Sequence, residues 1–155
     1  MLTSCEESQN KKNKIEISQN DFRNWVRKDE FKKVKLALEN GYDVNDLNVG
    51  GGNALHDSSS FKMTKLLIDN GANVNQQKHL MYDGWTPLHL HCIGGTDVEI
   101  VELLLDAGAD PEIIDSQGKK PLDYAMERSK SKEDWAIEYK KKADLIKGQM
   151  GNFSK

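Results

Sequence analysis

A four-residue motif recurs along this chain at a nearly constant interval, and this recurrence limits the possible folds more than any other feature. The motif reads Asn-Ala-Leu-His at 53–56, Thr-Pro-Leu-His at 86–89 and Lys-Pro-Leu-Asp at 120–123. The first two copies begin 33 positions apart and the second two begin 34 positions apart. Such an interval is typical of arrays in which each small unit buries its apolar face against the next. We therefore expect stacked repeats rather than one globular core.

A second motif recurs in step with the first. It is a glycine within a short segment rich in Asn and Asp, found at 39–45, 69–75 and 106–112. Its glycines, Gly41, Gly71 and Gly108, precede the next copy of the first motif by 12, 15 and 12 positions. The middle connection therefore carries three extra residues. We expect each glycine to supply the left-handed backbone conformation that ends a helix.

Together with the stretch Asp-Gly-Trp-Thr-Pro-Leu-His-Leu-His-Cys at 83–92, these motifs make the chain resemble ankyrin-repeat proteins. The resemblance covers about residues 19–147, with two well-matched central repeats and a degenerate repeat at each end. It implies an all-α solenoid of about four stacked helix-turn-helix units with projecting β-hairpin-like loops. It also implies that His56 and His89 hydrogen-bond the neighbouring loop. The Lys- and Asn-rich composition leads us to expect a short, stand-alone ankyrin protein of bacterial or viral type.

The repeats differ in length at one point. His56 and Gly71 lie 15 positions apart, against 19 for the equivalent pair one repeat later, so the repeat that holds serines 58–60 must have trimmed helices. The predicted organisation is a flexible polar tail at 1–17, an ankyrin-repeat domain at 18–148 (N-terminal capping repeat 18–45, repeats 46–75 and 76–112, C-terminal capping repeat 113–148) and a frayed tail at 149–155. We expect Gly148 to end the last helix.

Composition narrows the functional classes. Hydrophobic residues make up 37% of the 155 positions and mean hydropathy is −0.72, which suits a narrow apolar ribbon shared between repeats. A net charge of −3 gives no reason to expect general affinity for nucleic acid or anionic membranes. No apolar stretch approaches the ~20 residues that span a bilayer, and the N-terminus lacks a secretory signal pattern. We expect a cytoplasmic protein, in its own cell or delivered into a host cytosol.

One cluster, His89-Leu-His91-Cys92, invites a metal assignment. On a helix, the first and third of these residues point about 200° apart, and a structural zinc site needs about four ligands. We therefore expect structural histidines, an inert packed cysteine and no metal. No nucleophile–base–orienter set can be assembled from the sequence, so we expect no enzyme activity and no cofactor. A small metal or enzyme site at His91 and Cys92 stays an alternative.

Two short runs have a second possible reading. Gly50-Gly-Gly52 lacks the Lys-Ser or Lys-Thr of a phosphate-binding loop, and we expect it to allow a tight reversal at a loop tip. Lys140-Lys-Lys142 is diluted by nearby acidic residues, which favours a solvated helix face. The alternative is a nucleic-acid contact through this basic C-terminal helix.

Surface recognition is the function that remains, and the resemblance implies that a partner protein binds to the inner helices and loop tips. The extended middle loop brings Leu80, Met81 and Tyr82 next to Trp85, and aromatic residues and Met are enriched in interfaces. The alternatives are that Leu80 or Met81 fills the gap left by the short repeat and that Trp85 packs internally. The predicted partner-binding residues are Leu47, Asn48, His79, Leu80, Met81, Tyr82, Trp85, Ser116 and Gln117.

We therefore expect a non-catalytic, monomeric module that binds another protein as an inhibitor, an adaptor or a host-directed effector. Its largely rigid surface would carry an aromatic anchor in the middle loop and polar contacts at the flanking tips. Self-association through an imperfect cap is an alternative.

Overall fold

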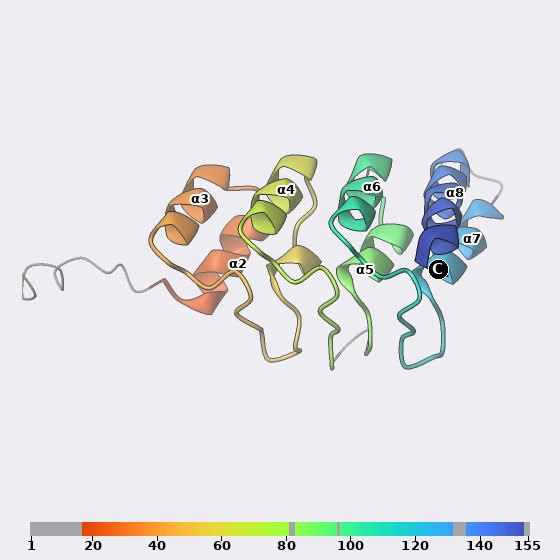
Figure 1. The fold of residues 1–155 in the computed structure, drawn as a ribbon. Coiled ribbons are helices and arrows are strands. Elements are labelled where there is room, and N and C mark those ends of the chain that lie inside the picture. Colours follow the sequence, from red (N-terminus) through yellow and green to blue (C-terminus); the bar gives the residue numbers. More distant parts are fainter. Residues whose placement is uncertain (1–16, 81–82, 96, 132–135, 154–155) are drawn as a thin grey trace, which may run out of the picture.

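The protein is a stack of helix pairs from which long loops project to one side. The computed structural model describes residues 17–80, 83–95, 97–131 and 136–153, with side chains described as far as Met150. The elements in chain order are α2 (Gln19–Arg27), α3 (Phe31–Glu39), the 3₁₀ turn η1 (Ala54–His56), α4 (Phe61–Asp69), α5 (Pro87–Ile93), α6 (Val98–Asp106), α7 (Pro121–Ser129) and α8 (Ala136–Phe153). In Figure 1, α3, α4, α6 and α8 form an outer row, and α2, η1, α5 and α7 form an inner row. These ranges contain no β-strand, and the predicted all-α solenoid is confirmed.

Short-range sequence signals set the helix ends. The Ser18 side chain accepts a hydrogen bond from the Asp21 amide at 3.1 Å and so caps α2, as expected at this position. Pro87 and Pro121 occupy the first turns of α5 and α7, where the missing N–H group is not needed. The glycines that follow α3, α4 and α6 have φ values of +82°, +83° and +88°. The predicted left-handed helix ends are therefore present.

The short repeat loses its inner helix and keeps its outer one. η1 spans three residues, whereas the equivalent α5 spans seven and the outer helix α4 has the same nine residues as α3 and α6. Side chains replace part of the missing helix. Ser58 Oγ donates to the Leu55 carbonyl at 3.0 Å, and Thr64 Oγ1 donates to Ser58 Oγ at 3.0 Å. The predicted trimming is confirmed, and it is confined to the inner element.

The apolar core is one continuous ribbon that runs through the repeats. Each helix pair adds four to six buried apolar side chains, and no repeat encloses a core of its own. This arrangement explains the low apolar content, because a ribbon between stacked units needs fewer buried residues than a globular centre. The largest fully buried apolar side chains are Phe22, Val26, Val34, Leu55, Met63, Leu67, Leu88, Ile100, Leu104 and Ile146.

The C-terminal helix α8 covers the open end of the ribbon through Tyr139, Ala143 and Ile146, which are 5%, 3% and 0% exposed. It runs to Phe153. The predictions that Gly148 ends this helix and that residues 149–153 belong to a frayed tail are therefore wrong. A glycine inside a helix costs only about 1 kcal/mol. Met150, one half-turn beyond it, still packs against the core, and this contact favours a longer helix.

Lys142 on α8 is buried rather than solvated. Its side chain is 0% exposed, and Nζ donates to the carbonyls of His91 at 2.9 Å and Gly94 at 3.0 Å. These carbonyls end α5, where a helix carries partial negative charge, so the lysine caps the neighbouring inner helix. The expected solvated face therefore holds for Lys140 and Lys141, which are exposed, and is wrong for Lys142.

At the N-terminal end, Ile17 packs against the core cluster, so ordered packing begins one residue before the predicted boundary. The rest of the predicted tail, 1–16, lies outside the described residues. In the described part of the chain, no helix combines the length and apolar character needed to cross a membrane.

Candidate functional site

Three loops project together from the stack (Figure 1). Each of them connects one outer helix to the next inner element. We call them finger 1 (42–53), finger 2 (72–86) and finger 3 (109–120). Asn45 in finger 1 donates through Nδ2 to the Gly71 carbonyl at 2.9 Å and accepts from the Asn73 amide at 2.7 Å. Asn75 in finger 2 makes the equivalent two bonds to finger 3. The repeated asparagines thus fix each finger against the next.

The repeated histidines tie the inner elements to the fingers. His56 Nε2 lies 3.1 Å from the Trp85 carbonyl oxygen, and His89 Nε2 donates to the Lys119 carbonyl at 3.2 Å. Each ring therefore contacts the loop of the following repeat, and the role implied by the family resemblance is confirmed. Desolvation by burial lowers the pKa of His56 to about 4 and also lowers the pKa of His89. Both rings are neutral at neutral pH.

The glycine run in finger 1 allows both a reversal and a close approach. Gly51 has φ +73°, and a Cβ atom built on it would lie 2.4 Å from Cδ2 of the His79 ring. The His79 amide donates to the Gly50 carbonyl at 2.7 Å, which joins fingers 1 and 2 along their edges. The predicted tight reversal is confirmed. His79, predicted as a partner contact, packs its ring on finger 1 although the residue as a whole is exposed.

Trp85 is part of the core, and the prediction that it is an exposed aromatic anchor is wrong. The side chain is 4% exposed, its Nε1 donates to Asp115 Oδ2 at 3.0 Å, and its ring lies 4.9 Å from that of Tyr124. Tyr124 donates to the same carboxylate oxygen at 2.5 Å. Burial raises the pKa of Asp115, but the hydrogen bonds outweigh this effect and lower it. The alternative of internal packing describes Trp85.

Exposed apolar side chains lie on all three fingers instead. Leu47 and Val49 of finger 1 are 41% and 93% exposed, Leu80 of finger 2 is 56% exposed, and Ile114 of finger 3 is 54% exposed. We call these four residues the fingertip row. Leu47 and Leu80 were predicted, whereas Val49 and Ile114 were missed. Their sequence positions could have indicated them, because both are apolar residues at a loop tip. The core of each repeat is already filled by other side chains. Leu80 does not fill the gap left by the short repeat, because it is exposed.

The remaining predicted residues divide into three kinds. Asn48 Oδ1 accepts from the Gly52 amide at 2.9 Å and so shapes finger 1. Ser116 and Gln117 are exposed at the tip of finger 3, as predicted. Met81 and Tyr82 lie outside the described residues.

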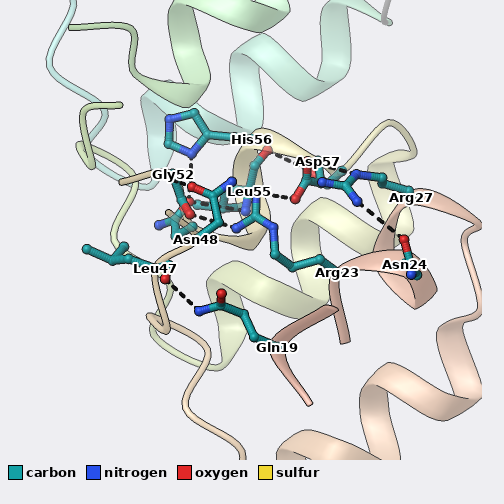
Figure 2. A network of polar contacts seen from close by, with 12 residues as sticks. Gln19, Arg23, Asn24, Arg27, Leu47, Asn48, Gly52, Leu55, His56 and Asp57 are labelled. Atoms are coloured by element: carbon teal, nitrogen blue, oxygen red, sulfur yellow. Dashed lines mark hydrogen bonds and ion pairs between the residues drawn. The ribbon is translucent and has the colours of Figure 1, made fainter. Parts of the chain in front are cut away.

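A polar network missed by the sequence analysis holds finger 1 and the short repeat against α2 (Figure 2). Gln19 Nε2 donates to the Leu47 carbonyl at 2.5 Å and to Asp46 Oδ1 at 2.8 Å. Arg23 is 3% exposed, and it donates to the Gly52 carbonyl at 2.6 Å and forms an ion pair with Asp57. The available signal was composition, because the chain has 19 lysines and only three arginines, of which two lie four residues apart on α2.

With this geometry described, comparison with known proteins assigns the chain. The family model for ankyrin repeats, in three copies, matches residues 55–139. The chain belongs to the ankyrin-repeat family. Ankyrin repeats are generally protein–protein interaction modules and are typically non-catalytic.

Two curated relatives illustrate how widely this ankyrin unit is used. The chain is 32% identical over 115 residues to "Inactive serine/threonine-protein kinase TEX14" of Bos taurus, a match that covers 74% of this chain and 8% of the relative. It is 49% identical over 61 residues to "Putative ankyrin repeat protein YahD" of Escherichia coli (strain K12), covering 36% of this chain and 28% of the relative. The matches therefore span well under two thirds of each relative.

The ankyrin chain carries no arrangement suited to chemistry at His91 and Cys92. Both side chains are buried, and burial lowers the pKa of His91 to about 4 and raises that of the Cys92 thiol to about 12. A thiol with such a pKa is a poor nucleophile and a poor metal ligand. Within the described ranges, no three His, Cys, Asp or Glu side chains lie close enough together to hold a metal ion.

One cavity lies on the outer row, away from the fingers. It has a volume of about 830 Å³ and is lined by α3 residues, including the half-exposed Leu36, together with Lys62 of α4. Two of its lysines, Lys33 and Lys35, pair with carboxylates on or next to their own helix. Nothing in the structure indicates what would cover this cavity, so it is not part of the candidate site.

Proposed function

We propose that this ankyrin chain is a non-catalytic module that binds a partner protein through the fingertip row and the adjoining inner surface. The fingertip row carries the proposal, because three successive fingers expose large apolar side chains, led by Val49 at 93%. Exposed apolar groups aligned on one side of a protein are typical of interaction sites. Aliphatic side chains take the place that the sequence analysis gave to Trp85.

The described parts of the fingers are hydrogen-bonded to one another and to the inner elements before any partner arrives. Each is hydrogen-bonded to the next through Asn45 and Asn75, and the histidine rings join them to the inner elements. A surface that is already ordered loses little conformational entropy on binding, which leaves more of the contact energy available as affinity. This supports recognition by a largely rigid surface.

The proposal extends to how the protein acts. A scaffold without reactive groups changes its partner by occupying a surface, which is the action of an inhibitor, an adaptor or a host-directed effector. We place it in a reducing cytosol as a monomer, and the free, buried thiol of Cys92 supports that compartment.

Affinity capture from the source cells tests the proposal. The variant Val49→Ser/Leu80→Ser shortens two apolar fingertips, and Ile137→Ser is the matched control because it changes a side chain of α8 that is 69% exposed. We expect the double variant to lose a partner that both the wild type and the control retain. If the double variant folds, as judged by its thermal unfolding, and keeps every specific partner, the fingertip row is not the binding site.

A further inference from the structure

The three fingers hold the whole net charge of this chain. They carry six carboxylates and three lysines, whereas the remaining residues carry 19 acidic and 19 basic side chains. With histidine counted as neutral, the fingers therefore have a net charge of −3 and the rest of the chain has none. Lys78 is included as a full positive charge, so the negative excess does not depend on its partner. The six carboxylates are those of Asp43, Asp46, Asp83, Asp110, Glu112 and Asp115.

The two lysines of finger 3 do not neutralise this excess, because each is held by a glutamate. Lys119 Nζ lies 2.7 Å from Glu127 Oε1 on α7, and Lys120 Nζ lies 2.5 Å from Glu112 Oε2. The finger carboxylates that form no ion pair with any described residue are those of Asp43, Asp46, Asp83, Asp110 and Asp115. Direct ion pairs within the described part of the chain therefore do not cancel the negative charge of the fingers.

Two of these carboxylates lie beside the fingertip row, and the first belongs to Asp46 on finger 1. Asp46 directly precedes Leu47, and Gln19 Nε2 donates both to Asp46 Oδ1 at 2.8 Å and to the Leu47 carbonyl at 2.5 Å. The Tyr42 hydroxyl donates to Asp46 Oδ2 at 2.9 Å. Both donors are neutral, so they orient the carboxylate next to the fingertip and leave its negative charge in place.

The second carboxylate belongs to Asp83, an exposed residue of finger 2 that lies against the tip of finger 3. The Asp83 carbonyl accepts a hydrogen bond from the Ser116 amide at 3.1 Å. A Cβ atom built on Gly84 would lie only 2.7 Å from Cα of Asp115, which shows how closely the two fingers approach. Ile114 of the fingertip row directly precedes Asp115. Asp83 therefore places a negative charge beside an exposed aliphatic tip, as Asp46 does on finger 1.

The sign of this surface selects the chemistry of its partner. Arg23, whose charge also reaches Asp46, is buried and paired with Asp57, so the surface of the fingers stays negative. A negative surface repels the phosphate backbone of nucleic acids and the headgroups of anionic membranes, and it attracts cationic groups. A small cation would leave the aliphatic side chains of the fingertip row unmatched. A protein segment that carries both basic and aliphatic side chains complements both features.

We propose that the fingers bind a segment of the partner protein in which Lys or Arg residues lie next to aliphatic residues. Asp46 and Asp83 are its ionic contacts, and the fingertip row is its apolar contact. This inference rests on the proposed function and names the chemistry of the partner. It commits to a basic segment because the fingers carry the negative charge of the chain, while the helices that support them belong to its neutral remainder.

A peptide titration followed by NMR tests this inference without the natural partner. The probe is acetyl-Lys-Leu-Lys-Lys-Leu-Lys-amide, called the Lys peptide. We expect it to shift the amide resonances of Val49, Leu80 and Ile114 saturably, with an affinity that falls as salt is added. A control peptide with Gln in place of each Lys should bind about tenfold more weakly, and one with Ser in place of each Leu about fivefold more weakly. Equal affinity for either control peptide overturns the inference, and so does failure of the Lys peptide to bind.

Variants locate the ionic contacts. Asp46→Asn/Asp83→Asn keeps the size of both side chains and should weaken binding of the Lys peptide by about fivefold, the order expected for losing two exposed ion pairs. Asp106→Asn/Asp144→Asn neutralises two exposed carboxylates on α6 and α8 of the outer row and should leave the affinity unchanged. Thermal unfolding checks that both variants fold. Unchanged affinity in the finger variant, or an equal loss in the outer-row variant, contradicts the inference.

The two proposals fail in distinguishable ways. If Val49→Ser/Leu80→Ser loses the captured partner while the Lys peptide does not bind, recognition of a basic segment is wrong and the proposed function stands. If Asp46→Asn/Asp83→Asn weakens the Lys peptide as expected while the fingertip variant keeps every partner, the fingers bind basic segments and the proposed function of the fingertip row fails.

Discussion

The inner segments of the second and third repeats begin with the same Leu-His pair and reach different structures. In the third repeat, α5 continues for seven residues, and Lys142 binds the carbonyls at its end. In the second, η1 stops after three residues, and the carboxylate of Asp57 pairs with Arg23 on the preceding inner helix. Backbone hydrogen bonds in one repeat are thus replaced by side-chain bonds in the other.

The largest expected effect concerns the ionic contact of the short repeat. Asp57→Ala leaves the guanidinium of Arg23 buried without its counter-charge, and we expect the free energy of unfolding to fall by about 3–5 kcal/mol. Asp69→Ala, which removes an exposed pair with Lys65 inside α4, should cost less than about 0.5 kcal/mol. Urea unfolding measures both. Similar losses in the two variants would mean that the ion pair does not hold the short repeat.

The next effect is a dependence of stability on pH that both repeats share. Burial lowers the pKa of His56 and of His91 to about 4, against about 6.5 for an unfolded imidazole. Between these values the unfolded chain binds protons that the folded chain does not, so stability is complete above about pH 6.5 and falls as pH drops toward 4.

Removing either imidazole isolates its share of this effect. The free energy of unfolding, measured with urea, should fall between about pH 7 and pH 4.5 in every variant. In His56→Gln, and likewise in His91→Gln, this fall should be about 2 kcal/mol smaller than in the wild type. A loss equal to that of the wild type would show that the ring is not held neutral by the fold. If only His91→Gln behaves as expected, the short repeat admits water to His56.

The smallest expected effect is a difference of about 1 kcal/mol between equivalent leucine positions of the two repeats. Leu55 and Leu88 occupy the same motif position, and both are 0% exposed. Either change to alanine should destabilise by about 2–4 kcal/mol, with Leu88→Ala costing about 1 kcal/mol more. The cavity beside the intact helix α5 cannot collapse, whereas the single turn of η1 can move into the space. A larger loss in Leu55→Ala would show that the short repeat is the more rigid of the two.

Sequence reasoning predicted the features that depend on neighbours a few residues apart. The cap at Ser18, the prolines in the first turns and the glycines after each outer helix all have this local origin. The family resemblance added the contacts of His56 and His89. For the candidate site, two of the four fingertip residues, Leu47 and Leu80, were predicted.

The errors share a long-range origin. Trp85 was expected at the surface, and its partner Asp115 lies 30 positions away. Lys142 was expected in solvent, and the carbonyl of His91 that binds it is 51 positions away. A single sequence does not show which distant carboxylate or carbonyl satisfies a long polar side chain. Burial of such groups therefore could not be predicted.

The recurrence of one motif every 33 or 34 residues determined that this chain is a stack of small repeated units, and the resemblance to ankyrin repeats added the helix pairs and the projecting loops. Such units bury their apolar faces only against their neighbours, so the pattern predicts stacking. Tertiary structure alone decided which fingers expose apolar side chains and which long polar side chains, such as Arg23 and Lys142, are buried. Those outcomes depend on pairings between repeats, such as Arg23 with Asp57, which form only once the units are stacked.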